Sequence, residues 1–169
     1  YLSAIQELIS KETTGFEIVK HGTNFCLIKD LTGHTKDEFN TALRRIWLLT
    51  IDLAEESLNS IKNKDETILK NIPLMDYSIN KFSNYCLRLL MKKGYINFQK
   101  TPAYYYLIRR IEEIADKYKD LSAVHSDKKE AINEELLTHF MKVNEHLKEY
   151  YALFYDYKEE NIEDLFKKT

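Results

Sequence analysis

Residues 101–121 have the sequence TPAYYYLIRRIEEIADKYKDL, and their spacing decides the fold class. Apolar side chains recur three or four positions apart, which is the period of an α-helix with one buried face. They are Tyr104, Leu107, Ile111, Ile114, Tyr118 and Leu121. Thr101 and Pro102 predict where the helix begins, because threonine favours the N-cap and proline the first helical position. The spacing is also typical of helices that pack against antiparallel neighbours.

The same helical period occurs on both sides of this stretch. Upstream, it predicts two long helices over residues 35–63 and 65–94. Downstream, we expect a break at residues 122–126 and then a helix over 127–155. The apolar face predicted for this helix consists of Ile132, Leu136, Phe140, Val143, Leu147, Tyr150 and Phe154. Asp156 begins a further helical pattern that the end of the chain interrupts.

Residues that favour helix ends support these boundaries. Thr35-x-x-Glu38 and Asp127-x-x-Glu130 are capping boxes, in which side chains accept from otherwise unpaired N–H groups at a helix start. Gly94 suits the position after a helix end, where the backbone adopts a positive φ. Pro73 lacks an N–H and predicts a kink in the second long helix.

The amino-terminal part of the chain has a different pattern. Residues 1–14 predict a short helix or connector. Two runs rich in β-branched and aromatic residues flank a turn at 21–24, which predicts a β-hairpin of strands 15–20 and 25–29.

The predicted fold is mainly α: an antiparallel three-helix bundle with a small N-terminal β-hairpin and an incomplete second helical unit. We expect a connector and hairpin over 1–34, the three-helix bundle over 35–121 and the start of the second helical unit over 122–169. With only 4 Gly and 2 Pro, the chain has too few turn residues for an all-β fold. The missing initiator methionine and the end inside a helical pattern indicate an excised fragment.

Charge and cysteine content exclude several classes of protein. Lys and Arg number 25 against 27 Asp and Glu, and no basic face with interleaved aromatic residues is evident, so we expect no direct nucleic-acid binding. No apolar run approaches the roughly 20 residues of a membrane span, so we expect no membrane insertion. Cys26 and Cys86 form no cysteine or histidine cluster, which favours a reducing, cytoplasmic setting.

The clearest candidate site is a stripe of acids in the opening stretch. Glu112, Asp116 and Asp120 lie four positions apart and share one helix face, where carboxylate oxygens could hold a metal ion. The alternative is a solvated face on which Arg109 pairs with Glu112 or Glu113.

Other catalytic and metal-binding patterns are weak. Asp76 is a further candidate metal ligand, although its neighbour four positions on, Asn80, is neutral and a poorer ligand. His139 and His146 lack the Glu-x-x-His spacing of a di-iron bundle. The chain has no nucleophile elbow, P-loop or glycine-rich dinucleotide turn.

Residues 109–120, Arg-Arg-Ile-Glu-Glu-Ile-Ala-Asp-Lys-Tyr-Lys-Asp, resemble the signature of PhoU-type phosphate-signalling regulators, in which an arginine precedes Glu-x-x-x-Asp. Residues 43–49, the acidic turn at 64–65 and Asp76-x-x-Ile79 follow in the family's order. Residues 15–30 are similar to the linker of archaeal-type members, which carry an AbrB-type DNA-binding domain upstream.

The resemblance implies two three-helix bundles related by pseudo-symmetry, several members of which bind multinuclear iron or zinc clusters. By position, Glu112 and Asp116 match the family motif and Asp76 matches the acid of the preceding helix. Three positions depart from the pattern: Asn80 replaces a second acid, Asp120 replaces an asparagine and Lys117 replaces a common histidine. These changes affect cluster assembly more than the bundle.

The function that the resemblance implies is non-enzymatic regulation of phosphate uptake or phosphate-responsive signalling by protein contact. The partner would be a phosphate transporter or a phosphate-sensing signalling or transcription protein. We also expect a homo-oligomer, because an interrupted helical unit leaves apolar faces uncovered. Two alternatives stay open: a carboxylate-metal enzyme on a helical bundle, and a plain helical dimerisation module.

Overall fold

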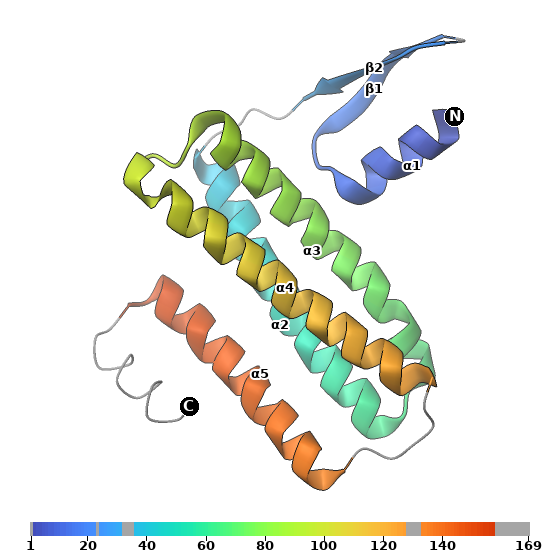
Figure 1. The fold of residues 1–169 in the computed structure, drawn as a ribbon, viewed down its shortest axis with the longest axis vertical. Coiled ribbons are helices and arrows are strands. Elements are labelled where there is room, and N and C mark those ends of the chain that lie inside the picture. The colour runs from blue at the N-terminus through green and yellow to red at the C-terminus, as the bar shows by residue number, and fades with distance from the viewer. Residues whose placement is uncertain (1, 23, 32–35, 128–132, 158–169) are drawn as a thin grey trace. The chain divides into compact units, whose positions relative to one another are not determined.

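The computed structural model describes residues 2–22, 24–31, 36–127 and 133–157, which are mainly helical (Figure 1). The elements in chain order are α1 (Leu2–Glu12), β1 (Phe16–His21), β2 (Cys26–Asp30), α2 (Lys36–Asn63), α3 (Glu66–Lys93), the 3-10 turn η1 (Phe98–Lys100), α4 (Thr101–Asp127) and α5 (Glu134–Tyr155). The predicted mainly α class with a small N-terminal hairpin is confirmed. None of the described helices is long and apolar enough to cross a membrane.

The chain divides into two compact units, and each unit combines two segments. The first unit contains Tyr1–Thr50 and Pro73–Asp116, and the second contains Ile51–Ile72 and Lys117–Thr169. The boundaries fall inside α2, α3 and α4, so these helices contribute residues to both units. The three-helix bundle and the sequential division at residues 34 and 121 stay predictions.

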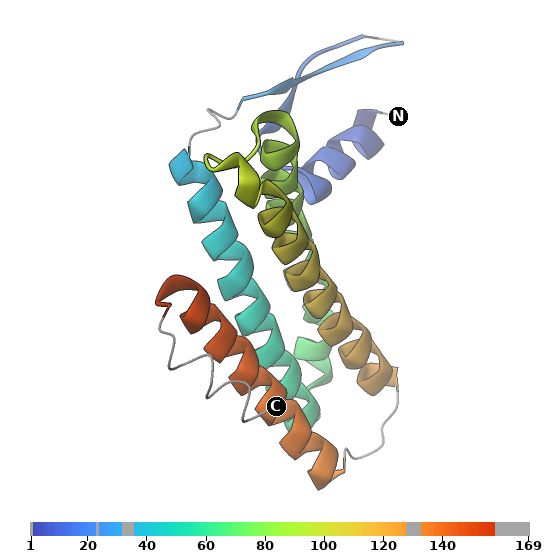
Figure 2. The ribbon, with the colours of Figure 1, turned by 60° about the vertical axis from the view of Figure 1, so that its left-hand side comes forward.

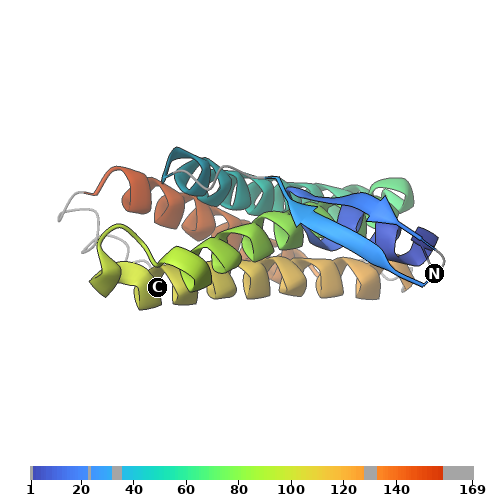
Figure 3. The same cartoon turned by 90° about the horizontal axis from the view of Figure 1, so that it is seen from above.

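The hairpin belongs to the first unit. Its strands are antiparallel, with Phe16 opposite Asp30 and Ile18 opposite Ile28, and the register shifts between Ile18 and Lys20. Figure 3 shows the strands as two separate arrows that run in opposite directions. The strand bounds agree with the predicted hairpin because alternating apolar residues and the intervening turn are local signals.

The core of the first unit comes from the first half of α2, the second half of α3 and the first half of α4, which run beside one another (Figures 1 and 2). An aromatic cluster joins them: the ring of Phe39 lies 5.6 Å from Tyr95 and 5.7 Å from Tyr104. Around it, apolar side chains are buried at Leu43, Ile46, Ile79, Cys86, Leu90, Ile108 and Ile111.

The second unit buries polar side chains among apolar ones. On α5, Asn144 accepts a hydrogen bond from the Tyr118 hydroxyl at 2.7 Å and donates to the carbonyl oxygen of Ala54 at 2.9 Å. The ring of Phe140 stacks on Tyr118 at 5.4 Å. These contacts join α2, α4 and α5 within this unit.

Helix ends follow the local sequence where the caps are described. Asp65 Oδ1 accepts from the N–H groups of Thr67 and Ile68 at 3.0 and 3.1 Å, which confirms the start of α3. Gly94 has φ +70°, which confirms its role after the end of α3. α3 continues through Pro73, and the predicted kink stays a prediction. Thr35 lies outside the described residues.

The break predicted at residues 122–126 is wrong. α4 continues to Asp127, and Ser122 within it is buried, with its hydroxyl donating to Ser57 Oγ at 3.0 Å. Asp127 therefore closes α4 and does not begin the next helix. Asn133 caps α5, accepting from the N–H of Glu135 at 2.9 Å, and Glu130 lies outside the described residues.

The predicted buried faces of α4 and α5 are partly wrong. On α4, Ile108 and Ala115 are fully buried, whereas Ile114 is 37% exposed. On α5, the described core residues are Leu137, Phe140, Asn144 and Leu147, whereas the predicted Leu136, Val143 and Tyr150 are exposed. The prediction used only large apolar residues, so it missed the buried Ala115 and Asn144. Thr101 is also not an N-cap, because its backbone is already helical.

Candidate functional site in the first unit

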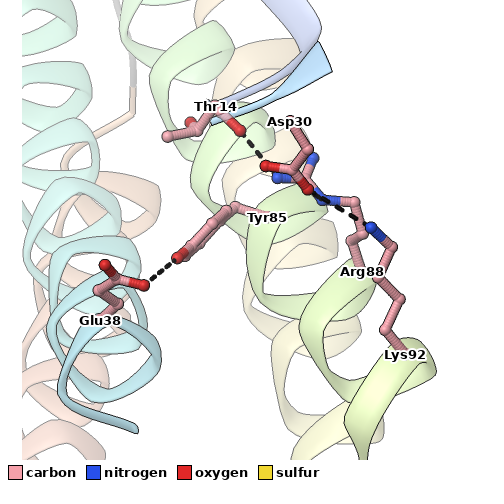
Figure 4. A network of polar contacts seen from close by, with 6 residues as sticks. All are labelled: Thr14, Asp30, Glu38, Tyr85, Arg88 and Lys92. Atoms are coloured by element: carbon pink, nitrogen blue, oxygen red, sulfur yellow. Dashed lines mark hydrogen bonds and ion pairs between the residues drawn. The ribbon is translucent and has the colours of Figure 1, made fainter. Parts of the chain in front are cut away.

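Arg88 on α3 anchors the hairpin. Its Nη2 donates to the carbonyl oxygen of Thr14 at 2.8 Å, and its Nε lies 3.7 Å from Asp30 Oδ2 at the end of β2 (Figure 4). The guanidinium also lies over the ring of Phe16, 4.2 Å from its centroid. One side chain therefore contacts both strands and the segment before them.

Two further groups extend this network (Figure 4). Lys92 Nζ lies 3.4 Å from Asp30 Oδ2 and is half exposed. The Tyr85 hydroxyl donates to Glu38 Oε2 at 3.1 Å, which joins α3 to α2. Burial, together with this hydrogen bond to a carboxylate, raises the pKa of Tyr85 to about 12. Tyr85 therefore stays a neutral donor at physiological pH.

Next to Tyr85, the first unit contains an open groove of about 800 Å³. Apolar side chains line it at Ala42, Leu48 and Phe82, and charged side chains of both signs line it at Glu38, Arg44 and Arg45. A recess with this lining can take an apolar group.

Three of the four predicted acidic site residues belong to the first unit. Asp76 on α3 is buried, and Asn80 Nδ2 donates to its Oδ2 at 3.1 Å. Glu112 on α4 is half-buried, and burial raises its pKa; the Arg109 charge lowers it, and the negative charges of Asp116 and Asp76 raise it further. Asp76 and Asp116 therefore each lie within electrostatic reach of Glu112.

The remaining acid, Asp120, lies on α4 in the second unit and is exposed. Asp120 is therefore not grouped with the three acids of the first unit. The pairing that the alternative interpretation predicts is also present, because Arg109 Nη1 pairs with Glu112 Oε2. Glu113 pairs with Arg110 at 2.6 Å.

The acidic residues do not fit a multinuclear iron or zinc cluster as they are arranged. Across the described ranges, no group of three or more His, Cys, Asp or Glu side chains could hold a metal ion. Glu112 Oε2 is already paired with the Arg109 guanidinium, so it is not free to serve as a metal ligand in this arrangement. Iron or zinc stays a prediction of the resemblance.

Sequence reasoning missed the anchor and the groove. Arg88 lies 74 positions from Thr14, and no local pattern connects them. A signal was nevertheless present: residues 77–111 contain no acid, so the cations of this segment must find partners elsewhere in the chain or in solvent. No family model, curated protein or solved structure matches this chain.

Proposed function

We propose that this chain is a non-enzymatic regulator of phosphate uptake, of the PhoU type, that acts by contact with a phosphate transporter or its signalling partner. One observation carries the proposal. Glu112 on α4 lies within electrostatic reach of Asp116 on the same helix and of Asp76 on α3, and the resemblance implies acids on these two helices. The mainly helical fold with an N-terminal hairpin is compatible with it.

The buried Cys86 thiol is removed from the candidate nucleophiles. Burial raises the pKa of the Cys86 thiol to about 12, so it is not a thiolate nucleophile at neutral pH. The open groove gives the first unit a recessed surface for a contact partner. No step of the proposed function uses a metal.

The direct test is phosphate uptake in cells of the source organism that lack this gene. We expect these cells to keep taking up radiolabelled phosphate when phosphate is ample. Expression of the wild-type chain should again reduce that uptake. Uptake that is the same with and without the chain would contradict the proposal.

A matched pair of variants tests the acidic residues. Glu112→Gln removes the charge that interacts with Asp76 and Asp116. We expect cells that express this variant to keep a high phosphate uptake. Glu113→Gln is the control, because it makes the same change at the next position on an exposed pair with Arg110. Circular dichroism of both purified variants shows whether they are folded. Equal restraint by two folded variants would remove the acids from the mechanism.

Metal content is measured separately, by elemental analysis after reconstitution of the metal-free chain with iron or zinc. Stoichiometric metal that is lost in Glu112→Gln plus Asp116→Asn would assign the metal to these carboxylates. Substoichiometric metal in the wild-type chain would remove the cluster and leave regulation by contact intact.

A further inference from the structure

The first unit contains a segment with an extreme charge bias. Between Asp76 and Glu112 the chain has no acidic residue, although acids outnumber bases in the chain as a whole. The segment carries seven cations, at Lys81, Arg88, Lys92, Lys93, Lys100, Arg109 and Arg110. It comprises the second half of α3, η1 and the first turns of α4, all in the first unit.

At the centre of this segment, the link between α3 and α4 exposes large apolar side chains. Met91 and Phe98 are each 76% exposed and Ile96 is 69% exposed. Figure 1 shows this link as the turn at which the chain reverses between the two helices. Single exposed apolar residues are ordinary, but three within eight positions of one turn form a patch.

The turn is held by defined contacts, so the exposure is built into the structure. The N–H of Tyr95 donates to Thr101 Oγ1 at 2.8 Å, and the Tyr95 ring packs on Tyr104 at 4.1 Å. Tyr95 thus joins the aromatic cluster of the core, whereas Ile96 and Phe98 on either side of Asn97 stay exposed. Asn97 Oδ1 accepts from the N–H of Gln99 at 3.2 Å and caps η1.

Lysines flank the exposed apolar residues. Lys93 and Lys100 are exposed, and Lys92 is half exposed beside Asp30. We name this surface the α3–α4 tip, which consists of Met91, Lys92, Lys93, Ile96, Phe98 and Lys100. Apolar side chains surrounded by lysines match the two layers of an anionic bilayer surface, the acyl boundary and the charged headgroups.

We propose that the α3–α4 tip binds the surface of an anionic phospholipid bilayer. Met91, Ile96 and Phe98 enter the headgroup region, and the lysines contact lipid phosphates. This inference is independent of the proposed regulatory function.

The exposed side chains favour a bilayer over a single-stranded nucleic acid. Bases stack on free aromatic faces. The Tyr95 and Tyr104 rings cover one another, and Arg110 lies 4.9 Å from the centroid of Tyr106. Of the three exposed apolar residues of the tip, Met91 and Ile96 are aliphatic and only Phe98 offers an aromatic face. Their chemistry suits acyl chains.

The first experiment is co-sedimentation of the full chain with vesicles. We compare phosphatidylcholine mixed with phosphatidylglycerol against phosphatidylcholine alone, at low and high salt. We expect a preference of roughly tenfold or more for the anionic vesicles, weakened by salt, because each lysine near an anionic surface contributes favourably. Equal binding to both vesicles, or no binding to either, would overturn the proposal, as would binding of a single-stranded RNA oligonucleotide without vesicle binding.

Variants then locate the binding surface. We expect Phe98→Ser and Lys93→Gln plus Lys100→Gln to weaken vesicle binding about tenfold each. The controls are Leu74→Ser, an exposed apolar residue elsewhere on α3, and Lys62→Gln on α2. Thermal unfolding identifies any variant that fails to fold. Tip variants that bind like the wild type, or controls that lose binding equally, would overturn the assignment.

A fluorescent variant makes the test independent of loss of function. Trp47 is the single tryptophan and is 4% exposed, so its emission provides a constant background. We expect Phe98→Trp emission to shift to the blue on anionic vesicles and to be quenched by brominated lipid. An unshifted, unquenched emission from vesicle-bound protein would show that the tip does not enter the interface.

Discussion

The two units stabilise their polar groups in different ways. In the second unit the hydrogen bonds of Asn144 are neutral and buried. In the first unit the contacts of Arg88, Asp30 and Lys92 are charged; the Arg88 and Asp30 side chains are 16% and 14% exposed, and Lys92 is half exposed. A buried neutral group that loses its partner keeps the whole desolvation cost, whereas a partly exposed charge is rehydrated. The unfolding free energy should therefore depend more on the Asn144 hydrogen bonds of the second unit. Its dependence on salt should come more from the charged contacts of the first unit.

The largest effect is expected from Asn144→Ala. It leaves the Tyr118 hydroxyl and the Ala54 carbonyl without their buried partner and opens a small cavity. We expect a loss of about 2–4 kcal/mol of unfolding free energy, measured by urea denaturation. Asn59→Ala, at an exposed position of α2, is the control. A loss below about 0.5 kcal/mol would show that the buried network does not dominate.

Arg88→Met is expected to cost about 2 kcal/mol, because it removes a hydrogen bond and an ion pair from a largely buried guanidinium. Faster amide hydrogen exchange in residues 16–30 should accompany the loss, since Arg88 anchors the hairpin. Lys92→Met serves for comparison, because Lys92 is half exposed and contacts only the same carboxylate among the contacts described. If both variants behave alike, Asp30 rather than Arg88 holds the strands.

Tyr118→Phe is expected to cost about 1 kcal/mol at neutral pH, for one buried hydrogen bond. Burial raises the pKa of Tyr118 to about 12, above the usual value of 10.0. The folded state therefore holds the proton more tightly, so its contribution is full below pH 10 and falls as the pH rises towards 12. Unfolding free energy measured across that range should decline less steeply in Tyr118→Phe. Tyr85 titrates in the same range, so part of the decline should persist.

The smallest effect is expected at the exposed pair of Lys148 and Glu55 in the second unit. Glu55→Gln should change the unfolding free energy by less than about 0.5 kcal/mol, because both side chains are largely hydrated. Urea denaturation at low and high salt measures it. A cost as large as that of Asn144→Ala would contradict the distinction between buried and exposed contacts.

The helix ends and the hairpin were predictable because their signals are local. Asp65 caps the helix that begins at the next residue, and Gly94 follows the helix that it ends. The end of α4 was not predictable from local signals, because the helical Ser122 is buried against a partner 65 positions away. Serine at an apparent break and serine in a buried contact look identical in a sequence.

The candidate site was predictable only in part. Helical spacing and the family resemblance selected Asp76, Glu112 and Asp116, and Glu112 lies within electrostatic reach of the other two, but their role as a metal site stays a prediction. The same spacing also selected Asp120, which belongs to the other unit. Helical periodicity specifies a face of a helix but not where along that helix one packed unit gives way to the next.

The way in which the units share helices constrains how this chain can be shortened. A fragment that ends at residue 116 keeps both segments of the first unit, together with residues 51–72 of the second. A fragment that begins at residue 51 keeps both segments of the second unit but removes half of the first. Neither unit is encoded by one uninterrupted stretch of gene. Recombination that exchanges whole domains at a single crossover could not therefore transfer either unit without carrying part of the other.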